Sequence, residues 1–229
     1  MRGPFLLCIV VVSVRAGGFD PARGTEETNG ADMAITAGPG ERYTIRRKFF
    51  KLFGAGFTVY DEAGNPLAYT HQKAFRLREN ITLYTDESKS DPMLTIRTDS
   101  VLDFSGSYDV ATPEGRVVGT LRRKGMKSSF VRDEWIVYTG DGQEHALIRE
   151  RGGFAPFARR WIESASAFLP QTFDVTRVGD GVQIATFRQH FNPVIYKLGI
   201  AINADDVHLD DLVLLAAASL IAAIEGRQS

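Results

Sequence analysis

Basic side chains recur in this sequence at a spacing that would suit the binding of an anion. Arg46 and Lys48 are separated by one position, as are Arg122 and Lys124. Side chains alternate along a β-strand, so each pair shares one face of its strand. With three further lysines the two pairs predict a patch for an anionic lipid headgroup, in which each cation contributes about 1 kcal/mol near a membrane. The three further lysines are Lys51, Lys73 and Lys127. The alternative is a charged exterior that only keeps the domain solvated.

Acidic side chains gather near the C-terminus, at Asp205, Asp206, Asp210 and Asp211. Calcium takes six to eight oxygen ligands, several of them usually carboxylates, so the four aspartates are a candidate calcium site. The stretch lacks the Asp-x-Asp-x-Asp-Gly pattern of a calcium loop. The alternative is a helix start, where acids interact favourably with the helix dipole. The sequence leaves both interpretations open.

Sequence patterns of the common enzyme classes are missing. The four histidines show no metal-binding spacing such as His-Glu-x-x-His; they are His71, His145, His190 and His208. No Gly-x-Ser-x-Gly elbow and no glycine-rich phosphate loop is present. We therefore expect a protein that is not an enzyme and has no catalytic residues, with calcium as the one candidate cofactor.

The composition is that of an ordinary globular protein, with 229 residues of which 44% are hydrophobic. The net charge of −1 gives no global bias toward nucleic acid. Cys8 is the single cysteine, so no disulfide forms within the chain, which favours a reducing compartment. We expect a cytoplasmic monomer, with a peripheral membrane association if the basic patch binds lipid.

The first 42 residues differ from the rest of the chain. Arg2 precedes an apolar run over residues 5–14, and a polar, glycine-rich stretch follows. The run is too short to span a bilayer, which needs roughly 18 apolar residues. Three interpretations stay open: a start at Met33, a signal peptide, or a membrane-surface anchor. In each, residues 17–42 are predicted to be a disordered linker and residues 43–227 the folded domain.

An internal repeat organises that domain. Four segments each begin with an aromatic residue, have Val two positions later, turn at a glycine and continue in an apolar run; they cover 57–73, 108–124, 135–151 and 173–189. Alternating strands around a glycine turn are typical of β-hairpins. Further strands are predicted near 43–50, 81–85, 93–98 and 194–202. Ten to twelve strands leave edges to protect, and closure into a barrel removes them.

Two helices interrupt the strands, at 154–168 and 209–224. From Leu212 to Ile224, Ser219 is the only residue that is not apolar. A helix that is apolar all round is buried on all sides or lies in a membrane, and thirteen residues are too few to cross one. We therefore expect this helix to fill the centre of the barrel.

Three motifs, in this order, resemble the LURP-one-related family of the tubby-like and phospholipid-scramblase superfamily. They are Tyr-x-Ile-Arg-Arg-Lys at 43–48, Val-Tyr-Asp-Glu-x-Gly-Asn-Pro at 59–66 and Asp-Asp-Leu-Val-Leu-Leu-Ala-Ala-Ala at 210–218. The resemblance covers about residues 42–225 and implies a twelve-stranded barrel wrapped around a hydrophobic C-terminal helix.

What the resemblance implies about function is less specific. Tubby domains bind phosphoinositides through basic residues, and scramblases carry an acidic stretch before the terminal helix, where this chain has Asp205, Asp206, Asp210 and Asp211. The cysteine-rich and proline-rich segments of scramblases are absent. The resemblance favours a non-enzymatic barrel that binds anionic phospholipid headgroups. The alternative is a structural or regulatory protein-interaction module.

Overall fold

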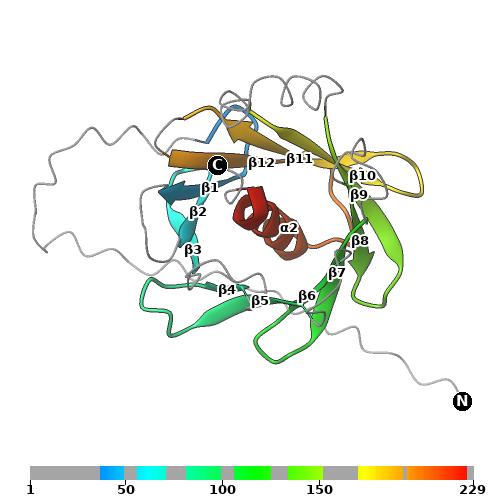
Figure 1. Ribbon diagram of the computed structural model, residues 1–229, viewed down its shortest axis with the longest axis horizontal. Coiled ribbons are helices and arrows are strands. Elements are labelled where there is room, and N and C mark those ends of the chain that lie inside the picture. The colour runs from blue at the N-terminus through cyan, green and yellow to red at the C-terminus, as the bar shows by residue number, and fades with distance from the viewer. Residues whose placement is uncertain are drawn as a thin grey trace, which may run out of the picture. The chain divides into compact units, whose positions relative to one another are not determined.

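The computed structural model describes residues 37–48, 56–70, 81–98, 106–124, 134–151, 170–192 and 195–225. Within them, twelve antiparallel strands close into one barrel (Figure 1), which confirms the predicted architecture. Each strand pairs with its neighbours in sequence, and β1 closes the barrel by pairing with both β2 and β12. The strands are β1 (Tyr43–Lys48), β2 (Phe57–Asp61), β3 (Pro66–Thr70), β4 (Ile81–Tyr84), β5 (Pro92–Thr98), β6 (Ser107–Ala111), β7 (Val117–Arg123), β8 (Glu134–Thr139), β9 (Glu144–Glu150), β10 (Thr172–Arg177), β11 (Gln183–His190) and β12 (Ile195–Ile202).

Short turns join the strands of each predicted hairpin. Their glycines have φ between 72° and 87° at Gly64, Gly115, Gly142 and Gly181, a backbone conformation that other residues rarely adopt. Inward and outward side chains alternate along the strands, as in β8, where Trp135 and Val137 are buried and Ile136 is half-buried. Local sequence therefore sets both the turns and the inner face.

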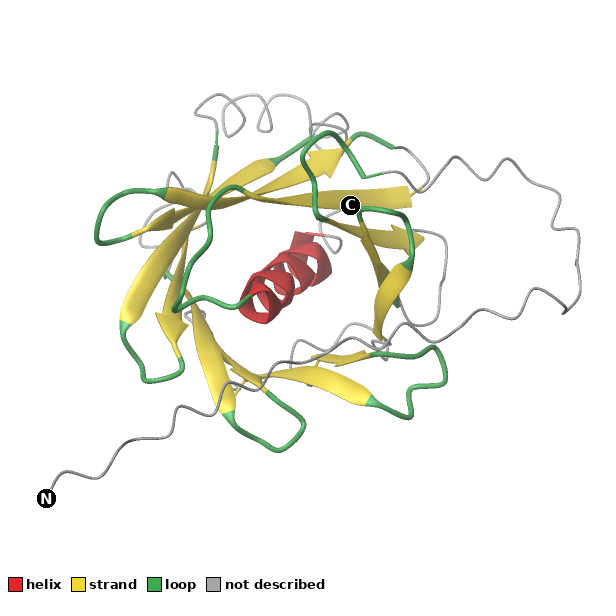
Figure 2. Cartoon of the chain, turned by 180° about the vertical axis from the view of Figure 1, so that it is seen from behind, coloured by secondary structure: helices red, strands yellow, loops and turns green. Residues whose placement is uncertain are grey.

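The helix α2 (Asp211–Glu225) runs through the middle of the barrel in both views (Figures 1 and 2). Every residue from Val213 to Ala223 is buried, so α2 is the core around which the strands close. Gly119 on β7 lets the helix approach, because a Cβ there would lie 3.0 Å from Cγ1 of Val213. The predicted central helix is confirmed.

Two predicted elements fall outside the described residues: the apolar run at 5–14 and the helix at 154–168. The predicted linker needs a correction at its end, because Glu41 is only 4% exposed and the backbone N–H of Arg42 donates to the carbonyl of Ile200. Residues 37–42 therefore belong to the folded domain. Among the described helices, none is long and apolar enough to cross a membrane.

Candidate functional site

The two ends of the barrel differ in charge. At one end, called the turn end, lie the five hairpin turns and the segment that leads into α2. These six connections contain ten acids and two cations. The acids are Glu62, Asp86, Glu87, Asp91, Glu114, Asp141, Asp180, Asp205, Asp206 and Asp210, and the cations are Lys89 and Arg116.

The opposite end, called the basic end, has the reverse balance. The three residues of each strand nearest this end, with Lys124 and Arg151 directly after β7 and β9, include eleven cations and four acids. The cations are Arg46, Arg47, Lys48, Arg97, Arg122, Arg123, Lys124, Arg149, Arg151, Arg188 and Lys197; the acids are Asp109, Glu134, Glu150 and Asp174.

The two predicted basic pairs lie at this end but on opposite walls. Arg46 and Lys48 belong to β1, Arg122 is on β7 and Lys124 follows it, and β1 and β7 are six strands apart in either direction around the closed barrel. The expectation of one continuous patch is thereby corrected, because barrel closure separates strands that a flat sheet would leave on one face. Lys51, Lys73 and Lys127 lie outside the described residues.

Some of these cations are already neutralised by neighbouring carboxylates. Glu134 accepts hydrogen bonds from Lys124 at 3.0 Å and Arg149 at 3.1 Å. The hydrogen bond from Arg149, more than that from Lys124, lowers the pKa of Glu134. Arg151 pairs with Asp174 at 2.6 Å. Four arginines of the basic end form no ion pair with any described residue. They are Arg46, Arg97, Arg122 and Arg188.

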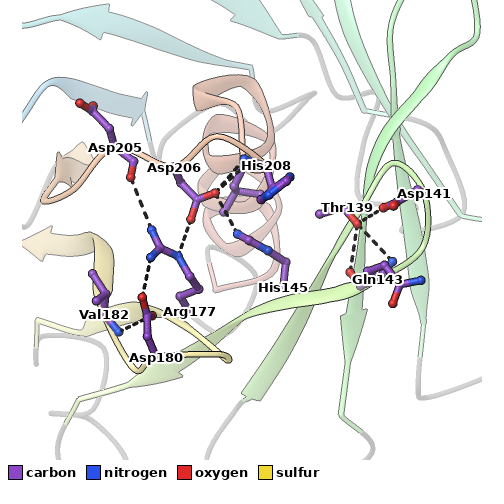
Figure 3. Close-up of polar contacts among 11 residues, drawn as sticks. Thr139, Asp141, Gln143, His145, Arg177, Asp180, Val182, Asp205, Asp206 and His208 are labelled. Atoms are coloured by element: carbon purple, nitrogen blue, oxygen red, sulfur yellow. Dashed lines mark hydrogen bonds and ion pairs between the residues drawn. The ribbon is translucent and has the colours of Figure 1, made fainter. Parts of the chain in front are cut away.

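Asp206 is the most connected of the four predicted calcium ligands (Figure 3). Its carboxylate, on a side chain 4% exposed, lies 2.9 Å from Nε2 of His145 and accepts a hydrogen bond from Nε of Arg177 at 2.8 Å. It also accepts hydrogen bonds from the backbone N–H groups of His208 and Leu209. Burial alone would raise the pKa of Asp206, but these hydrogen bonds outweigh it and lower the pKa to about 2. Asp206 thus anchors the segment before α2 to β9 and β10.

The other three acids have separate roles. Asp210 caps α2, since its Oδ1 accepts the backbone N–H of Leu212 at 3.0 Å. Asp211 accepts hydrogen bonds from the hydroxyl of Tyr43 at 2.7 Å and from Arg42 at 3.1 Å. The side chain of Asp205 is exposed. Among the described residues, no group of three or more His, Cys, Asp or Glu side chains is arranged to hold a metal ion, and calcium binding stays a prediction.

The bond between Tyr43 and Asp211 predicts a response to alkaline pH. Burial, and then the Asp211 carboxylate, raise the pKa of Tyr43 from its ordinary value of 10 to about 12. The unfolded chain loses this proton near pH 10. The hydrogen bond therefore makes its full contribution to the stability of the folded state below pH 10, and this contribution is lost as pH rises through 12. We expect Tyr43→Phe to lower the free energy of unfolding by about 1 kcal/mol at neutral pH.

Urea unfolding of the wild type and of Tyr43→Phe at several pH values measures this difference. The deficit of the variant should shrink as pH rises above 10. Tyr84→Phe, at a half-buried tyrosine of β4, serves as the control. A deficit of Tyr43→Phe that stays constant from pH 8 to pH 12 would contradict the assignment.

Several connected residues were missed by sequence reasoning. Glu41 lies within 2.6 Å of His190 although 149 positions separate them, and Arg177 and His145 meet Asp206 from different strands. None of these contacts has a local sequence signal. The one available signal was Gly199, a glycine inside the apolar run of β12. A glycine within a strand often marks a place where a ligand or another segment of the chain comes close to the backbone.

Comparison with known proteins gives two findings. A family model described as LURP-one-related matches residues 41–216. The X-ray structure of a protein from Arabidopsis thaliana, AT5G01750, is similar with a TM-score of 0.42 at 18% sequence identity, over 82% of this chain and 92% of that chain. No curated protein matches the sequence.

Proposed function

Since the chain belongs to the LURP-one-related family, we propose that its barrel is a non-enzymatic protein that binds anionic phospholipid headgroups through its basic end. The observation that carries this proposal is the separation of charge along the barrel. Ten acids lie in the connections of the turn end, and eleven cations gather at the other. A barrel so charged turns its basic end toward an anionic surface, because the field acts on the two ends in opposite senses.

The helix dipole of α2 is compatible with this distribution. The helix begins at the turn end, beside Asp210 and Asp211, and runs toward the basic end. A helix carries partial positive charge at its N-terminus and partial negative charge at its C-terminus. Asp210 and Asp211 therefore lie at the helix end that favours negative charge, whereas the last turn of α2 carries no basic residue.

The proposal predicts that anionic lipid is required for membrane binding. The protein should sediment with vesicles of phosphatidylcholine and phosphatidylserine at moderate salt, and not with phosphatidylcholine alone. The double variant Arg97→Glu, Arg122→Glu reverses two cations, on β5 and β7, that form no ion pair with any described residue. It should bind the anionic vesicles with at least about 2 kcal/mol less free energy, or about thirtyfold more weakly.

The matched control is Lys89→Glu, Arg116→Glu, which makes the same change in net charge at two exposed residues of the turn end. It should bind nearly as well as the wild type. Equal weakening by both double variants would mean that net charge alone attracts the protein. Indifference of the wild type to anionic lipid would remove the proposal and favour a protein-interaction module.

A further inference from the structure

The outer wall made by β1, β12 and β11 carries six outward-facing residues in two rows. Strand register places them directly opposite one another across the three strands. Opposite neighbours lie about 5 Å apart on one face of a sheet. The row nearer the turn end is Thr44, Gly199 and Arg188, and the next row is Arg46, Lys197 and His190. We call this set the outer array.

A carboxylate from outside the strands lies on the outer array. The side chain of Glu41 crosses Gly199, where a Cβ would be 2.0 Å from the carboxylate carbon, so only glycine leaves room for it. One oxygen accepts the backbone N–H of Gly38 at 2.7 Å, and the other lies 2.6 Å from Nε2 of His190. The Glu41 side chain is 3% exposed. The carboxylate thus fills a niche with Gly199 as its floor.

The surroundings of the niche favour negative charge. Burial alone would raise the pKa of Glu41, but hydrogen bonds from His190 and Gly38 and the charge of Lys197 outweigh it, and the pKa lies below its ordinary value. Arg46 and Arg188 form no ion pair with described residues. The Glu41 carboxylate is thus bonded to His190 and lies in the field of Lys197, and the register places Arg46 opposite Lys197 and Arg188 opposite Gly199.

A hydroxyl beside the niche lacks a hydrogen-bond partner. Thr44 lies directly opposite Gly199, is 1% exposed, and its Oγ1 makes no hydrogen bond to a described residue. A buried polar atom without a partner destabilises the folded state. The oxygens of the Glu41 carboxylate are held by Gly38 and His190, and neither makes a hydrogen bond with this hydroxyl. An anion with a third oxygen would have one to offer to this hydroxyl.

We propose that this niche is a binding site for a phosphate group, and that Glu41 occupies it as an internal substitute for that anion. A phosphate monoester carries about −1.5 to −2 charges at neutral pH and three acceptor oxygens, which suits the array better than one carboxylate does. Residues 37–41 hold the substitute in place through a short segment with glycines at 38 and 40. A competing phosphate displaces that segment.

The phosphate group comes either from a lipid headgroup or from free phosphate. In its lipid form the inference rests on the proposed function, because Arg46, Arg188 and Lys197 belong to the basic end. In its free form it is independent of any membrane. The test therefore uses two probes, inorganic phosphate and vesicles of phosphatidylcholine with phosphatidic acid, whose headgroup is a phosphate monoester.

The full-length variant Glu41→Ala empties the niche without removing a cation. We expect it to bind inorganic phosphate, followed by calorimetry and by the NMR signals of His190, at least about fivefold more tightly than the wild type, which corresponds to one charge. The matched control is Glu62→Ala, which removes an exposed acid at the turn end. Adding Arg188→Glu to Glu41→Ala should abolish the gain. If Glu41→Ala does not fold, Glu41→Gln keeps the shape of the side chain and should shift affinity in the same direction.

Each outcome decides the matter. A gain with inorganic phosphate in the absence of vesicle binding by any variant supports the niche and rejects the proposed function. A gain with vesicles but not with inorganic phosphate supports the niche and identifies the headgroup as the source. If Glu41→Ala binds both probes no better than Glu62→Ala, the inference is overturned, and Glu41 only stabilises the packing of residues 37–41 against the barrel.

Discussion

Replacing Leu220 with aspartate is expected to leave little folded protein. Leu220 is 1% exposed and lies in the middle of α2, which is itself the core of the barrel. Replacing a buried leucine with alanine typically costs about 2–5 kcal/mol, and a buried unpaired charge costs more, whereas whole domains are stable by about 5–15 kcal/mol. Leu215→Asp, at a residue 5% exposed, should behave alike. Circular dichroism and the yield of protein in solution measure the effect.

The control for these substitutions is Val207→Asp. Val207 lies just before the helix and is 99% exposed, so the same new charge should change the free energy of unfolding by no more than about 0.5 kcal/mol. Deleting every residue after Asp211 should abolish folding, because the inward faces of twelve strands would lose the helix that fills them. A truncated barrel that remains folded without lipid would show that α2 is an appendage.

Removing the carboxylate of Asp206 is expected to lower the free energy of unfolding more than any other polar substitution in the segment between β12 and α2. Asp206→Ala removes the acceptor of His145 and of two backbone N–H groups, and one of the two carboxylates that pair with Arg177. Removing one partner of a buried ion pair costs about 3–5 kcal/mol, and Arg177, a quarter exposed, regains some hydration, so we expect about 3 kcal/mol. Urea unfolding at neutral pH measures it. Asp205→Ala, at an exposed side chain one position earlier, should cost less than 1 kcal/mol.

The same carboxylate predicts a dependence on acid. Because the pKa of Asp206 falls from 3.8 in the unfolded chain to about 2 in the folded one, its contribution is fully present above pH 4 and is lost as pH falls through 2. This difference between the folded and unfolded pKa of Asp206 corresponds to roughly 2 kcal/mol of stability. In Asp206→Asn, stability should fall less between pH 4 and pH 2 than in the wild type. An identical acid dependence in both proteins would contradict the role given to Asp206.

Local patterns in the sequence were enough to predict the elements of this fold. Each hairpin turn needs a positive φ, and glycines 64, 115, 142 and 181 provide it. Alternation along the strands marks their inner faces, and a helix with a single polar residue between Leu212 and Ile224 can only be a core. These features depend on neighbours a few positions apart, where propensity and periodicity act. The helix and the closed barrel therefore followed from the sequence alone.

Which side chains meet was decided by the tertiary structure. Closure places β1 and β7 on opposite walls, so two basic pairs that look alike in sequence share an end but no surface. Strand register brings Glu41 onto Gly199 and within reach of His190, 149 positions away. Register and closure depend on the lengths and pairings of all twelve strands at once, whereas each local pattern is satisfied equally well by many arrangements. The sequence therefore determined which residues are charged and which are buried, and the closed barrel determined which charges face one another.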